Sequence, residues 1–421
     1  MTSKNSKDWV KLDNAAKIFP PTSNKADTKV FRFSCQLKDE ICPEDLQKAL
    51  DMTMEEFPIF QSVLRHGLFW YYLEHSDITP VVTQESQPPC SMIYDGTSKH
   101  LLFAVTYFKR RINLDTYHAL ADGTGSMQFI KTMLNNYIAL HYNEQPIIVS
   151  DFDSSYTQRN EDSFQKYYSD EKKSKKLFEK KSVYKFNGQK IPGNRLSIIE
   201  GEMSVQELLK IAHSHNTTLT IYLASVFLYS IYQDMPRSQQ NKAVTMDIPV
   251  NLRNYFHSAT TRNFFSVMNV SHIFSQDNNT LQSVIDELKT CFHDELTPTQ
   301  LEKRISKLTK IERNYLARAI PLIIKDPILK FANYVAQKNI TCSVSNLGAV
   351  TVPPEYEKYV EKFIVFVSTQ KLQVGVCSFK DKLSFTFSSP YISTEVQKNF
   401  FRFLSNENIH IDIYSNSDQL L

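Results

Sequence analysis

Glycine is scarce in this chain, with nine glycines in 421 residues against a usual share of about 7%. None of the sequences Gly-x-Gly-x-x-Gly, Gly-x-x-x-x-Gly-Lys and Gly-x-Ser-x-Gly occurs. This excludes the usual dinucleotide-binding loop, the phosphate-binding P-loop and the nucleophile elbow. Because no convincing serine or cysteine nucleophile is present, an α/β hydrolase or thioesterase is disfavoured.

Long apolar runs, paired cysteines and excess charge are also missing. No apolar run reaches the ~18 residues of a membrane span, and the first residues lack the apolar core of a secretory signal. The six cysteines show no Cys-x-x-Cys spacing, so free thiols in a reducing cytosol are expected rather than disulfides or zinc. A net charge of +3 argues against a nucleic-acid partner. We expect a cytoplasmic monomer without a bound metal or transmembrane segment.

The length and the order of apolar patterns predict a two-domain α/β protein. A polar, lysine-rich segment separates two halves that each mix strands with helices. We divide the chain into an N-terminal half (1–160), a crossover linker (161–194) and a C-terminal half (195–421). The linker lysines indicate a solvated surface or, alternatively, attraction for an anionic ligand.

Apolar alternation and continuous apolar runs predict strands at 28–37, 62–74, 80–83, 100–108, 112–116, 196–202, 244–250, 265–274, 341–344, 363–368, 372–378 and 382–388. Helical spacing predicts helices at 43–57, 125–141, 204–213, 219–232, 280–308, 310–325 and 390–404. Each half should therefore form a mixed sheet flanked by helices.

The stretch from Tyr117 to Gly125 is the strongest candidate for a reactive site. It places His118 and Asp122 four residues apart, followed by Gly123 and Gly125, which indicate a tight turn. A strand should precede this stretch and a helix should follow it, so rigid elements would hold the imidazole.

Histidine titrates close to neutral pH, so His118 suits the transfer of a proton from an attacking hydroxyl or amine. Asp122 has two alternative roles: it orients His118, as in a catalytic triad, or it holds the loop by pairing with an arginine. The spacing favours the second role, and Arg253 is the candidate partner because it also lies just past a strand. The pair His213 and His215 offers only a weak alternative metal site, without nearby cysteine or acidic ligands.

The His118-Ala119-Leu120-Ala121-Asp122-Gly123 sequence resembles the His-x-x-x-Asp-Gly motif of the chloramphenicol-acetyltransferase-like acyltransferases. The alcohol acetyltransferase-like proteins are the most similar subgroup, and condensation domains are also related. Three further stretches resemble the superfamily in order and spacing: Pro58-Ile59-Phe60 with Arg65, Pro249 to Arg253 with Arg262-Asn263-Phe264-Phe265, and Ser345-Asn346-Leu347-Gly348. Tyr117 departs from the second histidine of condensation domains, and the plant Asp-Phe-Gly-Trp-Gly motif is absent.

The resemblance implies two domains facing each other across an active-site tunnel, with His118 as the general base midway along it. It implies acyl-CoA as a cosubstrate, no permanently bound cofactor, and a small-molecule alcohol or amine as acceptor. It also implies an Asp122–Arg253 pair and Ser345 or Asn346 as donors to the oxyanion, although both also suit a simple turn before Gly348. The alternative is a non-catalytic protein that keeps the tunnel and holds an apolar ligand.

Overall fold

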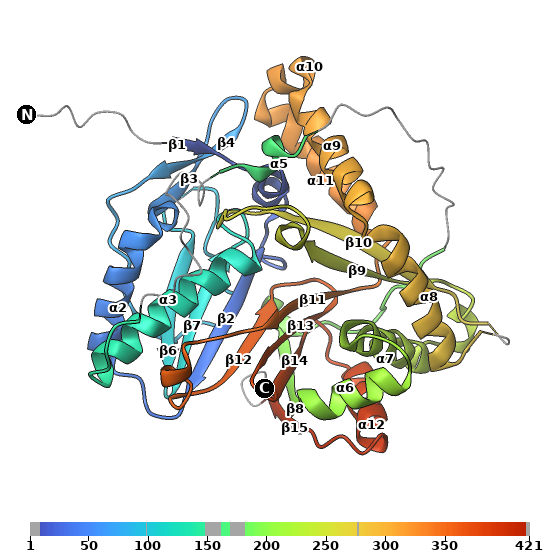
Figure 1. Cartoon of the computed structure of the whole chain (residues 1–421). Coiled ribbons are helices and arrows are strands. Elements are labelled where there is room, and N and C mark those ends of the chain that lie inside the picture. Colours follow the sequence, from blue (N-terminus) through green and yellow to red (C-terminus); the bar gives the residue numbers. More distant parts are fainter. Residues whose placement is uncertain (1–8, 98, 148–160, 169–181, 276–277, 418–421) are drawn as a thin grey trace, which may run out of the picture.

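A computed structural model of the chain describes residues 9–97, 99–147, 161–168, 182–275 and 278–417. The middle of the expected linker, residues 169–181, lies outside the described residues, as does the boundary expected at residue 160. The described strands form two large sheets and a small one, with helices packed on their outer sides (Figure 1). The fold is therefore the expected α/β architecture with two sheet-rich parts.

The first large sheet has the strand order β12-β2-β7-β6-β5. Its strands are β2 (Val30–Leu37), β5 (Thr83–Gln84), β6 (Phe103–Phe108), β7 (Arg111–Tyr117) and β12 (Val360–Val367). The helices α2 (Pro43–Glu56) and α3 (Gly123–His141) pack together beside it (Figure 1). Apolar residues of α2 and α3 join those of the sheet in one buried core, which holds both elements around the His118 loop.

The second large sheet has the strand order β10-β9-β11-β13-β14-β8-β15. Its strands are β8 (Ser197–Ser204), β9 (Val244–Asn251), β10 (Phe265–His272), β11 (Cys342–Ala349), β13 (Leu372–Phe379), β14 (Lys382–Ser389) and β15 (Asp412–Ser415). The helices that contribute to its core are α6 (Val205–Ser214), α7 (Leu219–Asp234), α8 (Leu281–Glu295), α9 (Pro298–Arg313) and α12 (Glu395–Asn406). The mostly apolar helix expected at 219–232 is confirmed as a helix with most of its residues buried.

Strand β12 connects the two sheets. Its neighbours in sequence, β11 and β13, lie in the second sheet, yet β12 pairs antiparallel with β2 in the first. Its Lys362 is buried and lies 2.8 Å from Glu200 and 3.2 Å from Glu202, both on β8. Leaving such a buried carboxylate without its partner costs about 3–5 kcal/mol, so this ion-pair group fixes β12 between the sheets.

Three expected elements differ from the structure because glycine and proline divide them. The strand expected at 62–74 is a hairpin of β3 (Ser62–His66) and β4 (Tyr71–His75) that turns at Gly67, and β1 (Trp9–Lys11) joins it to form the small sheet. The helix expected at 280–308 is interrupted before Pro298 and becomes α8 and α9. The helix expected at 310–325 divides into the end of α9, α10 (Tyr315–Ala319) and α11 (Leu322–Gln337), with Pro321 directly before α11.

None of the helices in the described residues is long and apolar enough to cross a membrane. Helices α9, α10 and α11 instead stand together at the top of Figure 1, and α11 contacts the short helix α1 (Phe19–Thr22).

Candidate active site

His118 follows β7 directly and precedes α3, in the expected strand–loop–helix setting. Its backbone amide donates to the carbonyl of Lys29, the residue before β2, at 2.9 Å. Asp122 caps the helix, because its Oδ1 accepts from the amide of Gly125 at 3.0 Å. The backbone on both sides of the imidazole is therefore fixed.

Aromatic rings from three elements surround the His118 ring. Phe19 of α1 stacks on it with ring centres 4.3 Å apart, Phe31 of β2 meets it edge-on at 5.1 Å, and Phe265 of β10 lies at 5.5 Å. Since β2 and β10 belong to different sheets, the ring lies where the two sheets meet. The residue remains partly exposed, and burial of the imidazole lowers the pKa of His118.

A polar chain reaches the opposite side of the ring. The Nδ1 of His118 lies 3.1 Å from Oδ1 of Asn263, and the Nδ2 of Asn263 donates to Oδ2 of Asp13 at 3.3 Å. Asp13 is buried and also accepts from the backbone amides of Asn263 and Ala16. Burial raises the pKa of Asp13 to about 6, although the Arg262 guanidinium opposes this shift.

Asp122 faces away from this chain and pairs with Arg253, the partner expected from the sequence. The Nη1 of Arg253 lies 2.8 Å from Oδ2 of Asp122, which also accepts from the backbone amide of Phe264 at 2.9 Å. The rest of the guanidinium donates to the carbonyls of Thr260 and Arg262. The pair therefore fastens the segment before β10 to the start of α3. Because Asn263 belongs to that segment, the pair also keeps Asn263 next to His118.

The two glycines of the motif permit close approaches rather than a tight turn. Neither is among the residues with positive φ, and both lie in the first turn of α3. A Cβ on Gly125 would lie 1.9 Å from the carbonyl oxygen of Thr261, whereas one on Gly123 would meet only the side chain of Leu347, at 2.7 Å. The absence of a side chain at Gly125 therefore lets the start of α3 approach the segment before β10.

The two oxyanion candidates lie on β11, and their neighbour Leu347 touches the start of α3. The Nδ2 of Asn346 donates to the Thr220 hydroxyl at 2.9 Å, and its Oδ1 accepts from the Gly348 amide at 2.8 Å. Both polar ends of Asn346 thus have partners that hold a local turn, which makes Ser345 the better remaining candidate.

Asp13 and Phe19 were not singled out by the sequence, and Asn263 was noticed only as part of a motif. Asp13 lies outside any periodic pattern, and nothing in the sequence connects it with a residue 250 positions away. Phe19 lies before Pro20-Pro21 in a segment without a clear pattern. Only the folded chain brings these residues to the imidazole.

The two histidines considered as metal ligands, His213 and His215, lie outside the site around His118. His213 borders a hollow of about 650 Å³ with Lys289 and His293, while His215 bonds to Gln282, so the two histidines do not converge on one site.

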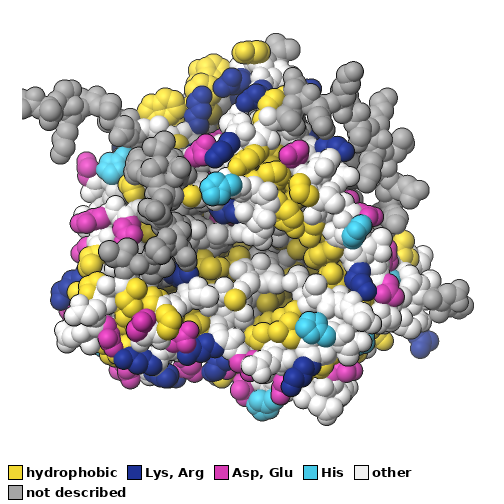
Figure 2. Space-filling model, viewed as in Figure 1, with side chains coloured by type: hydrophobic (Ala, Val, Ile, Leu, Met, Phe, Trp, Pro, Cys, Tyr) yellow, Lys and Arg dark blue, Asp and Glu magenta, His cyan; other side chains and the backbone are white. Residues whose placement is uncertain are grey.

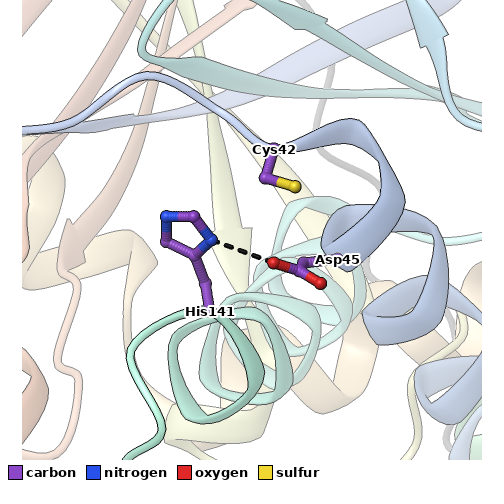
Figure 3. Close-up of side chains that lie close together, drawn as sticks. All are labelled: Cys42, Asp45 and His141. Carbon is purple, nitrogen blue, oxygen red and sulfur yellow. Dashed lines mark hydrogen bonds and ion pairs between the residues drawn. The ribbon is translucent and has the colours of Figure 1, made fainter.

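Cys42, Asp45 and His141 do lie together, between the start of α2 and the end of α3 (Figure 3). They offer sulfur, oxygen and nitrogen, a donor set that suits zinc. However, His141 Nδ1 already bonds to Asp45 at 3.0 Å and the Cys42 thiol bonds to Glu44 at 3.2 Å. These bonds satisfy the group without an ion, and we interpret it as a tie between the two helices.

Comparisons with solved structures show the same fold at low sequence identity. The polyketide synthase associated protein 5 of Mycobacterium tuberculosis matches with 13% identity and a TM-score of 0.59, covering 93% of this chain and 96% of that one. The trichothecene 15-O-acetyltransferase of Fusarium sporotrichioides matches with 11% identity and a TM-score of 0.61, covering 95% and 94%. The first condensation domain of the calcium-dependent antibiotic synthetase matches with 12% identity and a TM-score of 0.61, covering 96% and 97%.

No curated protein sequence matches the chain. A family model described as alcohol acetyltransferase matches residues 163–408, a range that includes Arg253, Asn263 and Ser345 and begins after His118. The match spans more than half of the 421 residues. The chain therefore belongs to the alcohol acetyltransferase family, within the chloramphenicol-acetyltransferase-like superfamily.

Proposed function

We propose that the protein moves an acyl group from acyl-CoA to the hydroxyl or amine of a small-molecule acceptor, with His118 as the general base. Family membership supports acyl transfer, and solved structures of the same fold contain coenzyme A. The observation that carries the proposed role of His118 is the bond between its Nδ1 and an asparagine amide that Asp13 orients.

This chain of bonds supports a tautomer of His118 in which Nδ1 holds the proton. The Nδ2 of Asn263 faces the Asp13 carboxylate, because the opposite orientation would set two oxygen atoms against each other. The Oδ1 that faces His118 can only accept, so the proposed tautomer has its hydrogen on Nδ1. In the neutral ring Nε2 is then left with its lone pair, ready to accept a proton.

The proposed reaction is a single transfer without an enzyme-bound acyl group. His118 Nε2 takes the proton of the acceptor while the acceptor oxygen or nitrogen attacks the thioester carbonyl carbon. When the tetrahedral intermediate collapses, the carbon–sulfur bond breaks and the His118 imidazolium protonates the leaving CoA sulfur. The products are the ester or amide and free CoA thiol, and Ser345 is proposed to donate to the oxyanion.

Asp122 is proposed to act as a positioning residue, through Arg253, rather than as the partner of His118. Its carboxylate is fully engaged by Arg253, Phe264 and Gly125, and it has no bond to the imidazole. An unpaired Asp122 would have favoured the alternative of a non-catalytic ligand-binding protein, so the pair with Arg253 supports the proposed acyl transfer.

The direct test measures CoA thiol release by the purified protein with a panel of acyl-CoAs, each with and without alcohols or amines. We expect release that depends on both the acyl donor and the acceptor, and mass spectrometry of the product then separates ester from amide. Binding of acyl-CoA or of an apolar ligand without turnover of any acceptor would instead favour the non-catalytic alternative.

The value of kcat/KM should be maintained to a lower pH than an ordinary histidine base would allow. Burial lowers the pKa of His118, so the neutral ring persists below the usual value of about 6.5. We therefore expect kcat/KM to stay constant as the pH falls from about 8 and to decline with an apparent pKa below about 6.5. An acid-side pKa above 7 would contradict a buried neutral base. Profiles in two buffers of different ionic strength control for salt effects.

Replacing Asp13 by asparagine should separate activity from stability. The variant keeps the size of the side chain but no longer forces the orientation of Asn263, so acyl transfer should fall by about tenfold or more. KM for acyl-CoA should change little, because Asp13 is buried and its bonds reach His118 through Asn263.

The same variant should not be less stable at pH 7. The folded-state pKa of Asp13 is raised from 3.8 to about 6, so the native state binds more protons than the unfolded state between these pH values. The contribution of Asp13 to stability therefore falls with rising pH across this window, by an amount on the order of 3 kcal/mol, and the asparagine variant lacks this fall. Denaturant unfolding at several pH values checks this, and a less stable variant with normal activity would contradict the assignment.

A further inference from the structure

Helix α11 (Leu322–Gln337) has its apolar side turned outward. Ile323 is 80% exposed, Phe331 69% and Ile328 57%, and Ile324, Tyr334 and Val335 are also exposed. At 100° per residue, these positions occupy one face of the helix, an arc of roughly 140°. Because isolated exposed apolar residues are ordinary but a whole exposed helix face is not, this face needs a covering partner.

Polar contacts fix this orientation from the other side of the helix. Lys325 Nζ donates to the carbonyl of Phe69 at 2.9 Å, and Asp326 accepts from the Tyr71 hydroxyl at 2.6 Å. The amide of Leu322 donates to the carbonyl of Leu68 at 2.8 Å. The helix is thus bonded to the β3–β4 hairpin through its polar side. Its apolar side therefore faces away from the hairpin.

The hairpin adds to the apolar surface. Leu68, at its turn, is 67% exposed, and Trp70 is exposed with Lys11 Nζ lying 4.8 Å from its ring. Figure 2 shows hydrophobic and basic side chains interspersed at the top of the molecule, where α9 to α11 stand in Figure 1. We call the exposed residues of α11 together with Leu68 and Trp70 the α11 surface.

The segment that carries this surface has an excess of positive charge. Residues 298–340 contain nine lysines or arginines against three acidic residues, a formal charge of +6, while the rest of the chain carries −3. Lys330 is exposed on α11, and Lys338 lies 4.1 Å from the ring of Tyr334. A second copy of the chain would bring a second +6 segment to this face, whereas an anionic surface complements both its charge and its apolar residues.

We propose that the α11 surface docks on an anionic lipid bilayer, with the helix lying in the plane of the interface. An outward apolar face with aromatic residues and a lysine- and arginine-rich surround is the arrangement that binds at the level of lipid head groups. Exposed apolar side chains insert between the lipids, and the basic residues attract their phosphates. Docking of this kind requires no membrane-spanning segment.

Docking would also bring the proposed reaction close to the bilayer. Helix α11 contacts α1, and Phe19 of α1 stacks on the His118 ring, so α11 and the short helix α1 lie between the bound lipid surface and the imidazole. If the proposed acyl transfer holds, an apolar acceptor dissolved in the bilayer would have a short route to the site. The docking itself does not depend on the acyl transfer.

The test is flotation of the full chain with vesicles of phosphatidylcholine, alone or mixed with phosphatidylglycerol. We expect binding to the mixed vesicles that weakens as salt is raised. The double variant Ile323→Ser, Ile328→Ser should bind at least about tenfold more weakly, because it removes two inserted side chains. Lys330→Glu with Lys338→Glu should lose the preference for the anionic lipid.

The matched control is Ile392→Ser with Ile413→Ser, which removes two isoleucines that are 52% and 55% exposed outside this surface. It should bind vesicles like the wild type, and thermal unfolding should show all variants folded. The proposal would be overturned if the Ile323→Ser, Ile328→Ser variant bound vesicles as well as the Ile392→Ser, Ile413→Ser control. It would also be overturned if the wild type did not bind. Light scattering that shows a wild-type dimer and a monomeric Ile323→Ser, Ile328→Ser variant would also overturn it, because a second copy would then be the partner. CoA thiol release, measured in solution, fails or succeeds independently of each outcome.

Discussion

Replacing His118 by alanine should reduce acyl transfer by about 10²- to 10⁴-fold, the usual contribution of a positioned general base. The loss should appear in kcat, since the imidazole is proposed to act on the proton of the acceptor and not to hold CoA. The variant should remain folded, because Phe31 and Phe265 belong to strands of the two large sheets and Phe19 belongs to α1, which packs against α11. CoA thiol release under saturating acyl-CoA measures the effect.

Asparagine at position 118 provides a second variant, since it keeps a polar group near Asn263 but lacks a basic nitrogen. It should be as inactive as alanine, and added imidazole should restore part of the activity of the alanine variant by occupying the vacated space. Undiminished thiol release in either variant would refute the proposed mechanism, even if the protein proves to be an acyltransferase.

Replacing Gly125 by alanine should lower the free energy of unfolding by about 3 kcal/mol, the upper range for overpacking at a buried contact. The added Cβ would lie 1.9 Å from the Thr261 carbonyl oxygen, which is backbone and cannot rotate away. The start of α3 and the segment that carries Asn263 would have to separate. Acyl transfer should therefore fall as well, because the Asn263 amide would move from His118. Denaturant unfolding and thiol release measure the two effects.

Gly123→Ala is the control, because it makes the same chemical change two residues away in the same helical turn. Its added Cβ would meet the end of the Leu347 side chain, which is flexible, rather than rigid backbone. Alanine also favours the helix by up to about 1 kcal/mol over glycine, so the net change should be within about 1 kcal/mol. Equal destabilisation by both substitutions would show that the contact with Thr261 is not the reason for glycine at position 125.

Much of the local structure followed from short-range patterns. The strand before His118, the helix after it and the helix at 204–213 were all expected, and all three are present. The structure adds that the Ser204 hydroxyl caps the last of them by accepting from the Glu207 amide. The expected positions of Asp122 and Arg253, each just past a strand, were also correct, and their side chains lie 2.8 Å apart. Their role in function stays a prediction.

Other features required contacts that no short stretch contains. The sequence gives no reason for residues 360–367 to leave the second sheet and pair with β2, or for Asp13 to meet Asn263. The glycines of the motif were interpreted as a sign of a turn, because the sequence cannot show that a carbonyl from residue 261 approaches Gly125. The linker boundaries remain a prediction, and part of that segment lies outside the described residues.

The sequence alone determined the types of the elements, their order and the histidine motif, because periodicity, capping and proline or glycine breaks act over a few residues. The tertiary structure decided that Nδ1 of His118 faces the side-chain oxygen of Asn263, and it decided that the apolar side of α11 faces outward. Both depend on residues far apart in the chain, Asp13 with Asn263 and Tyr71 with Asp326, whose contacts exist only once the sheets have packed.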